Sequence, residues 1–130
     1  MSRMKREIIG SMSDLARNGD DNLCAHFRFS ENYIGFQGHF PDHKVLPGIS
    51  QIHCVQVMLE EWRKEPMHLK EVVRAKYFQP VHPGEEIECK IKDEKITGDE
   101  CVVKAHITRE SETIAQFSLI FSFGLQAAAS

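Results

Sequence analysis

The segment that follows Pro47-Gly48 constrains the fold of this chain most strongly, because it predicts a helix that must be buried. Residues 49–64, ISQIHCVQVMLEEWRK, carry apolar side chains around most of a helical circumference. Such a helix is surrounded by other elements, whereas a surface helix has a single apolar stripe. The apolar positions are Ile49, Ile52, Val55, Val57, Met58, Leu59 and Trp62.

The neighbouring segments predict an antiparallel sheet that covers this helix. Residues 23–29 alternate between apolar and polar side chains, which is typical of a strand with one buried face. Four later segments predict a meander, with turn residues at 82–84 and at 97–99. They are HLKEVVRAKYFQPV at 68–81, EEIECKIKDEK at 85–95, CVVKAHITR at 101–109 and TIAQFSLIFSF at 113–123.

At the N-terminus, the spacing of Ile8, Met12 and Leu15 predicts a short amphipathic helix over residues 5–17. The fold class is therefore α+β, with a curved antiparallel sheet wrapped around one central helix. We expect one domain over residues 1–130: an N-terminal helix and turn at 1–20, a core at 22–124 and a tail at 125–130. Because such a sheet leaves one side of the helix open, we expect a symmetric dimer.

Composition excludes several classes of protein. A net charge of -3 argues against a nucleic-acid binder, since phosphate neutralisation requires a basic excess. No apolar run approaches the roughly 20 residues of a membrane span, and no signal-peptide core follows the N-terminus. The four cysteines form no CxxC pair, which indicates reduced, structural thiols. We therefore expect a cytoplasmic protein.

Two separated motifs carry a resemblance to a known family. Residues 36–48 read FQGHFPDHKVLPG, and residues 76–88 read KYFQPVHPGEEIE, which is similar to a strand–turn–strand motif of the type KF-x-x-PV-x-PGD. In this order they resemble the hotdog-fold beta-hydroxyacyl-[acyl carrier protein] dehydratases of bacterial fatty-acid synthesis. The resemblance covers residues 22–123. Gln51 and the short N-terminus are closer to the dehydratases of aryl-polyene and related lipid pathways.

The resemblance implies removal of water from a 3-hydroxyacyl thioester to give the trans-2-enoyl thioester. The substrate would arrive on the phosphopantetheine arm of acyl carrier protein, so no separate cofactor is expected. The family's catalytic histidine falls on His39, its helix-opening glycine on Gly48, and its helix carboxylate, from the other subunit, on His53. The side chains expected to contact the substrate are Phe36, Phe40, Pro47, Gln51 and Val57.

The chemistry explains why these residue types are suitable. His39, with an ordinary pKa of about 6.5, suits removal of the α-proton at neutral pH. The backbone N–H of Gly48, at the positive end of a helix, suits the developing enolate oxygen. Burial lowers the pKa of a histidine, so neutral His53 would protonate the leaving hydroxide poorly. Asp42 is the candidate by sequence for a carboxylate that could orient His53.

Simpler interpretations stand beside these. His39 could be a turn residue, and His53 is about as well explained as a core histidine. His43 follows His39 by four residues, but Pro41 between them excludes a helical metal-ligand pair, so no metal is expected. The basic side chains that could meet an acidic carrier protein, or form an ordinary charged face, are Arg63, Lys64, Lys70, Arg74 and Lys76.

Two other functions remain open from the sequence. With histidine in place of the carboxylate, the chain could be a non-catalytic acyl-binding or scaffolding subunit that pairs with an active paralogue. An acyl-thioesterase with the same fold is the other alternative.

Overall fold

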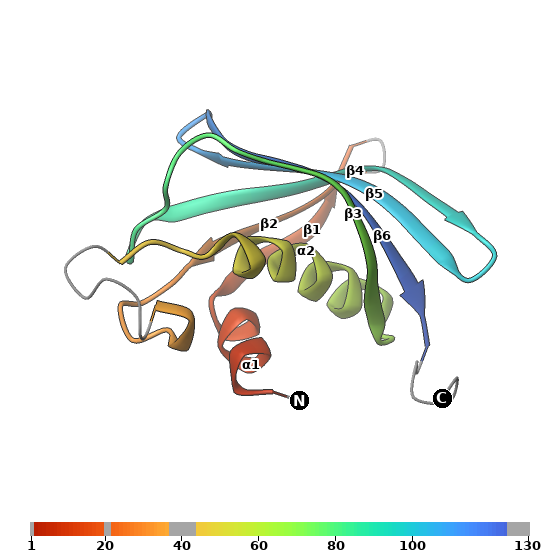
Figure 1. Ribbon diagram of the computed structural model, residues 1–130, viewed down its shortest axis with the longest axis horizontal. Helices are drawn as coiled ribbons and strands as arrows, with labels where there is room; N and C mark the ends of the chain where they lie inside the picture. Colours follow the sequence, from red (N-terminus) through yellow and green to blue (C-terminus); the bar gives the residue numbers. More distant parts are fainter. Residues whose placement is uncertain (1, 20–21, 37–43, 125–130) are drawn as a thin grey trace.

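The computed structural model describes residues 2–19, 22–36 and 44–124. An antiparallel sheet of six strands curves over one long helix, α2 (Gly48–Arg63), as Figure 1 shows. A shorter helix, α1 (Arg3–Gly10), packs against α2 on the side that faces away from the sheet. The strands are β1 (Met12–Asn18), β2 (Asn22–Arg28), β3 (Met67–Tyr77), β4 (Glu86–Thr97), β5 (Glu100–Arg109) and β6 (Glu112–Phe123), and a short 3-10 helix, η1 (Ile34–Phe36), follows β2.

The burial predicted for α2 is confirmed. Pro47 adopts extended backbone at the N-cap, and its carbonyl accepts the N–H groups of Ser50 and Gln51 at 3.1 and 3.3 Å. The helix ends at Lys64, whose φ of 58° is left-handed. The side chains of α2 that are buried are Ser50, Gln51, Ile52, Cys54, Val55, Val57, Met58 and Leu59.

The inner face of the sheet supplies the rest of the core. Alternate residues of β2, β4, β5 and β6 point toward α2 and are almost fully buried, as their period-two pattern predicts. All four cysteines are buried and free, in agreement with the expectation of reduced thiols. The strand residues of this face are Leu23, Ala25, Phe27, Ile87, Cys89, Ile91, Cys101, Val103, Ala105, Ile107, Ala115, Phe117, Leu119 and Phe121.

The helix predicted over residues 5–17 is wrong in its second half. The helix stops at Gly10, where the N–H of Ser11 bonds to the carbonyls of Glu7 and Ile8. The chain then enters β1, which pairs antiparallel with β2. Backbone pairing with a neighbouring strand outweighs a weak local helical pattern, because helix propensity differs little between ordinary residues.

The meander predicted for the last four strands is also wrong for the first of them. The strand order is β1-β2-β4-β5-β6-β3, so β3 pairs with β6 and not with β4. Residues 78–85 therefore connect the edge of the sheet to its interior, where a hairpin was expected. This connection passes the beginning of α2, and the N–H of Leu46 bonds to the carbonyl of Val81 at 2.8 Å. In the described part of the chain, no helix is long and apolar enough to cross a membrane.

Candidate active site

An open groove of about 370 Å³ lies at the beginning of α2. Gly48 and Gln51 contribute to it from α2, Val45 and Leu46 from the segment before, and residues 77–80 from the end of β3 and beyond. Two segments that are distant in sequence, residues 45–51 and 77–80, thus meet at the positive end of the helix dipole. We call this cavity the α2 groove.

Tyr77 lies directly against Gly48. A Cβ atom added to Gly48 would be 2.5 Å from the Tyr77 hydroxyl oxygen and 2.6 Å from Cζ. The Tyr77 ring also packs edge-on against Phe117, with ring centroids 5.5 Å apart. Burial raises the pKa of Tyr77 above its ordinary value, so its hydroxyl is protonated at neutral pH. Close approach of this side chain therefore explains why glycine opens α2.

Gln51 brings a buried polar group to the same groove. The residue is only 3% exposed, and its Oε1 atom has no hydrogen-bond partner among the described residues. A buried acceptor without a donor is costly, so such groups are rare in folded proteins unless a ligand or water satisfies them. Gln51 therefore brings to the α2 groove a buried acceptor that a donor N–H or O–H group of a ligand or a water could satisfy.

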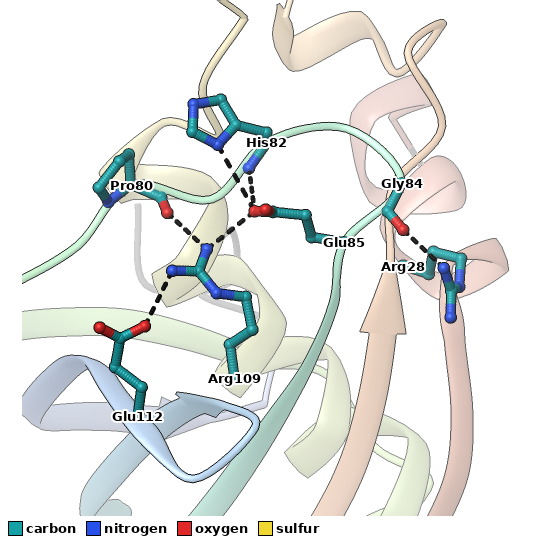
Figure 2. A network of polar contacts seen from close by, with 7 residues as sticks. All are labelled: Arg28, Pro80, His82, Gly84, Glu85, Arg109 and Glu112. Atoms are coloured by element: carbon teal, nitrogen blue, oxygen red, sulfur yellow. Dashed lines mark hydrogen bonds and ion pairs between the residues drawn. The ribbon is translucent and has the colours of Figure 1, made fainter.

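Polar contacts, which Figure 2 shows, hold Pro80, one of the residues that line the α2 groove. Arg109 Nη1 donates to the Pro80 carbonyl and to Glu85 Oε1, both at 2.8 Å, and Nη2 donates to Glu112 Oε1 at 3.1 Å. Glu85 also accepts the backbone N–H of His82 at 2.8 Å. That hydrogen bond, with the charge of Arg109, holds the pKa of Glu85 below its ordinary value. The carboxylate therefore stays ionised and these contacts persist through the neutral range.

His53 lies outside the α2 groove. Its side chain lines a separate pocket of about 210 Å³ beside α1, with Ser2, Met4, Lys5 and Gln56. Burial, and secondarily the positive charge of Lys5, lowers the pKa of His53. The imidazole is therefore neutral at pH 7, as the sequence predicted.

The remaining predicted residues fall into three groups. His39 and Phe40, together with Asp42, lie outside the described residues. Pro47 directly precedes the groove at the N-cap of α2. The other two predicted substrate contacts, Phe36 and Val57, are 3% and 1% exposed within the core and are not part of the groove lining.

Tyr77 is one of the groove residues that sequence reasoning missed, together with Val45, Leu46 and residues 78–80. It lies within the motif at 76–88, where the family pattern has phenylalanine, and this one difference was the available signal. The described residues contain no group of three or more His, Cys, Asp or Glu that could hold a metal ion.

Two of the basic residues considered for carrier-protein binding are already paired within the chain. Arg63 contacts the buried carboxylate of Glu94, and Lys70 contacts Glu100. For these two side chains the structure favours the interpretation as an ordinary charged face.

Comparison with known proteins identifies the family. The family profile of ApeI-like proteins, described as ApeI dehydratase, matches residues 15–118. The chain belongs to the ApeI-like dehydratase family. The 3-hydroxyacyl-[acyl-carrier-protein] dehydratase FabZ of Clostridium botulinum (strain Okra) is 31% identical over 100 residues, which cover 72% of this chain and 69% of that protein. FabZ of Clostridium novyi is 27% identical over 100 residues, with 72% and 70% covered.

Solved structures show the same fold. The dehydratase heterocomplex ApeI:P from Xenorhabdus doucetiae matches with a TM-score of 0.68 at 17% identity, covering 85% of this chain and 96% of that one. A Lactococcus lactis protein whose name assigns it to the thioesterases matches with a TM-score of 0.70 at 13% identity, covering 97% and 99%. The hotdog fold and the dehydratase family expected from the two motifs are thus confirmed.

Proposed function

We propose that this ApeI-like protein dehydrates 3-hydroxyacyl thioesters carried by acyl carrier protein, giving trans-2-enoyl thioesters for fatty-acid or polyene synthesis. Family membership is the observation that carries the proposal, and relatives about 30% identical are named for this reaction. The α2 groove supports it, since it combines a helix-opening glycine with a buried polar group that has no partner among the described residues. No cofactor is required beyond the phosphopantetheine arm of the substrate, and we place the reaction in the cytoplasm.

In the proposed mechanism, His39 removes the α-proton, and the negative charge that develops on the thioester oxygen is stabilised by the Gly48 N–H and the dipole of α2. The electron pair of the broken C–H bond forms the double bond, while the bond from the β-carbon to the hydroxyl oxygen breaks. The leaving hydroxide takes a proton and departs as water. Because burial keeps His53 neutral, we assign the return of this proton to His39.

We further propose that the protein acts as a homodimer. Apolar side chains are exposed along β3, where Val72 is 41% and Val73 is 55% exposed, and on α2, where Ile49 is 49% exposed. Within the described chain β3 borders only β6, so its other edge is open to pairing. A second copy that added to this edge would cover the apolar residues and bring its α2 beside the first.

A heterodimer is the second candidate assembly. The structurally similar ApeI:P is a dehydratase heterocomplex, and the helix carboxylate expected in this family is replaced here by His53. In such an assembly the chain would bind acyl groups or support an active paralogue.

One assay separates these functions. Purified protein is incubated with enoyl and 3-hydroxyacyl thioesters of acyl carrier protein, and both the enoyl absorbance and the release of free thiol are followed. Interconversion of the two thioesters that disappears in His39→Ala supports the dehydratase. Thiol release would instead indicate a thioesterase. Tight acyl binding without either reaction would indicate a scaffolding subunit.

A further inference from the structure

The hydroxyl group of Tyr77 is an additional polar group in the α2 groove. The side chain is 48% exposed and lines the groove together with Gly48 and Gln51. Among the described residues the Tyr77 hydroxyl has no hydrogen-bond partner, whereas the other tyrosine, Tyr33, is 2% exposed and bonds to Ser50 at 2.7 Å. The groove therefore contains a protonated, unpartnered phenol where the family motif has only a phenyl ring.

The position of this hydroxyl is fixed and relevant to the chemistry. It lies 2.5 Å from where a Cβ of Gly48 would be, so it lies beside the first residue of α2. The edge-on contact with Phe117 and the backbone pairing of β3 with β6 hold the ring in this place. An oxygen atom bound by the N–H of Gly48 would lie within reach of the Tyr77 hydroxyl as well.

We propose that Tyr77 donates a hydrogen bond to the thioester carbonyl oxygen of the bound acyl group, as a second donor beside the Gly48 N–H. This inference rests on the proposed function and names a catalytic contact for it. A second donor stabilises the enolate oxygen further and so favours α-proton removal in a site where no helix carboxylate assists. Gln51 also lines this groove, and its buried Oε1, which has no partner in the described chain, can accept a hydrogen bond from an N–H or O–H group elsewhere on the same ligand.

Tyr77→Phe tests the proposal, since it removes one oxygen atom and keeps the ring. We expect kcat for dehydration to fall about 10²-fold, as for loss of one oxyanion donor, with an unchanged melting temperature. Tyr33→Phe is the matched control: it removes the buried bond to Ser50, so it should lower the melting temperature but leave kcat within about twofold. Equal kcat in wild type and Tyr77→Phe would overturn the proposal.

A binding experiment separates this contact from the dehydratase assignment. A saturated acyl-pantetheine thioester and the thioether of the same length, which lacks the carbonyl oxygen, are titrated calorimetrically into both proteins. Wild type should prefer the thioester by about three- to tenfold, and Tyr77→Phe should lose most of this preference. If wild type shows no dehydration but Tyr77→Phe still loses the preference, the proposed function fails and the Tyr77 contact stands. An identical preference in the two proteins overturns the contact.

Discussion

Tyr77 and Gly48 are 29 positions apart in sequence, yet their atoms are so close that one added methyl group would overlap the phenol, with 2.5 Å between a new Cβ and the hydroxyl oxygen. The contact joins the end of β3 to the start of α2. Position 48 therefore requires glycine for two reasons: a side chain would collide with Tyr77, and the backbone N–H must stay accessible. Any substitution at one residue must therefore be interpreted together with the other.

Gly48→Ala should remove most of the activity and lower the free energy of unfolding by about 1–3 kcal/mol, because the methyl group collides with Tyr77. The double variant Gly48→Ala/Tyr77→Ala should recover part of this stability. Gly10→Ala is the control, since nothing lies within 4 Å of a Cβ at that position. Chemical denaturation measures all of them, and equal losses in Gly48→Ala and Gly10→Ala would contradict the steric argument.

Arg109→Met should reduce kcat/KM by about tenfold, mainly through KM, because it frees the Pro80 wall of the α2 groove. Arg28→Met is the matched control. Arg28 donates to the carbonyl of Gly84, which also lies in the connection at residues 78–85, but it does not contact Pro80. Steady-state kinetics on the enoyl thioester makes the comparison. If the two variants behave alike, the Arg109 contacts serve the stability of the connection and not the groove.

His53 should titrate below its ordinary pKa of about 6.5, and Lys5→Gln should raise that pKa by removing a nearby positive charge. Histidine ring signals followed by NMR report both values. A titration at the ordinary pKa would contradict the effect of burial, and a titration well above pH 7 would show that His53 carries a proton at neutral pH, against the proposed mechanism.

The same shift predicts the pH dependence of stability. Folding lowers the pKa of His53, so the unfolded chain binds the proton more readily, and the stabilisation is complete above about pH 6.5 and lost as pH falls below it. His106, whose pKa is also lowered by burial and by Lys92 and Lys90, acts in the same direction. His53→Gln should therefore reduce, but not abolish, the drop in melting temperature between about pH 7.5 and 5.5. An unchanged drop would contradict the assignment.

Val73→Lys should convert the proposed dimer to a monomer, because it places a charge on the exposed apolar edge of β3. Ile96→Lys is the control, because Ile96 is 51% exposed and Val73 is 55% exposed, but Ile96 lies on β4 near the hairpin to β5. This variant should leave the proposed dimer intact. Light scattering after size-exclusion chromatography gives the masses. A monomeric wild type, or dimers in both variants, would exclude β3 as the interface.

The sequence predicted the elements whose signal is local. The apolar circumference of α2 and the alternation of β2, β4, β5 and β6 reflect burial on known faces, so periodicity was sufficient. It failed for β1, where Asp14, with a φ of 57°, and a shift of register against β2 interrupt the alternation. It also failed for the place of β3, because a strand's own pattern does not identify its partner.

The candidate site was also predictable only where its signal is local in the sequence. The spacing of the family motif placed Gly48 at the opening of the buried helix, as observed. The contact of Tyr77 depends on two elements that meet only in three dimensions, and the pocket around His53 depends on how α1 packs against α2. Neither contact can be predicted from the spacing of residues along the sequence.

The open side of β3 has a consequence for how this protein is made. Along the edge of β3 that borders no other strand in the described chain, backbone groups lie beside exposed valines and form a template onto which an extended polypeptide can add. If the proposed dimer forms through this edge, a newly synthesised copy is prone to aggregate until it pairs with its partner subunit, and its yield in a cell depends on the supply of that subunit.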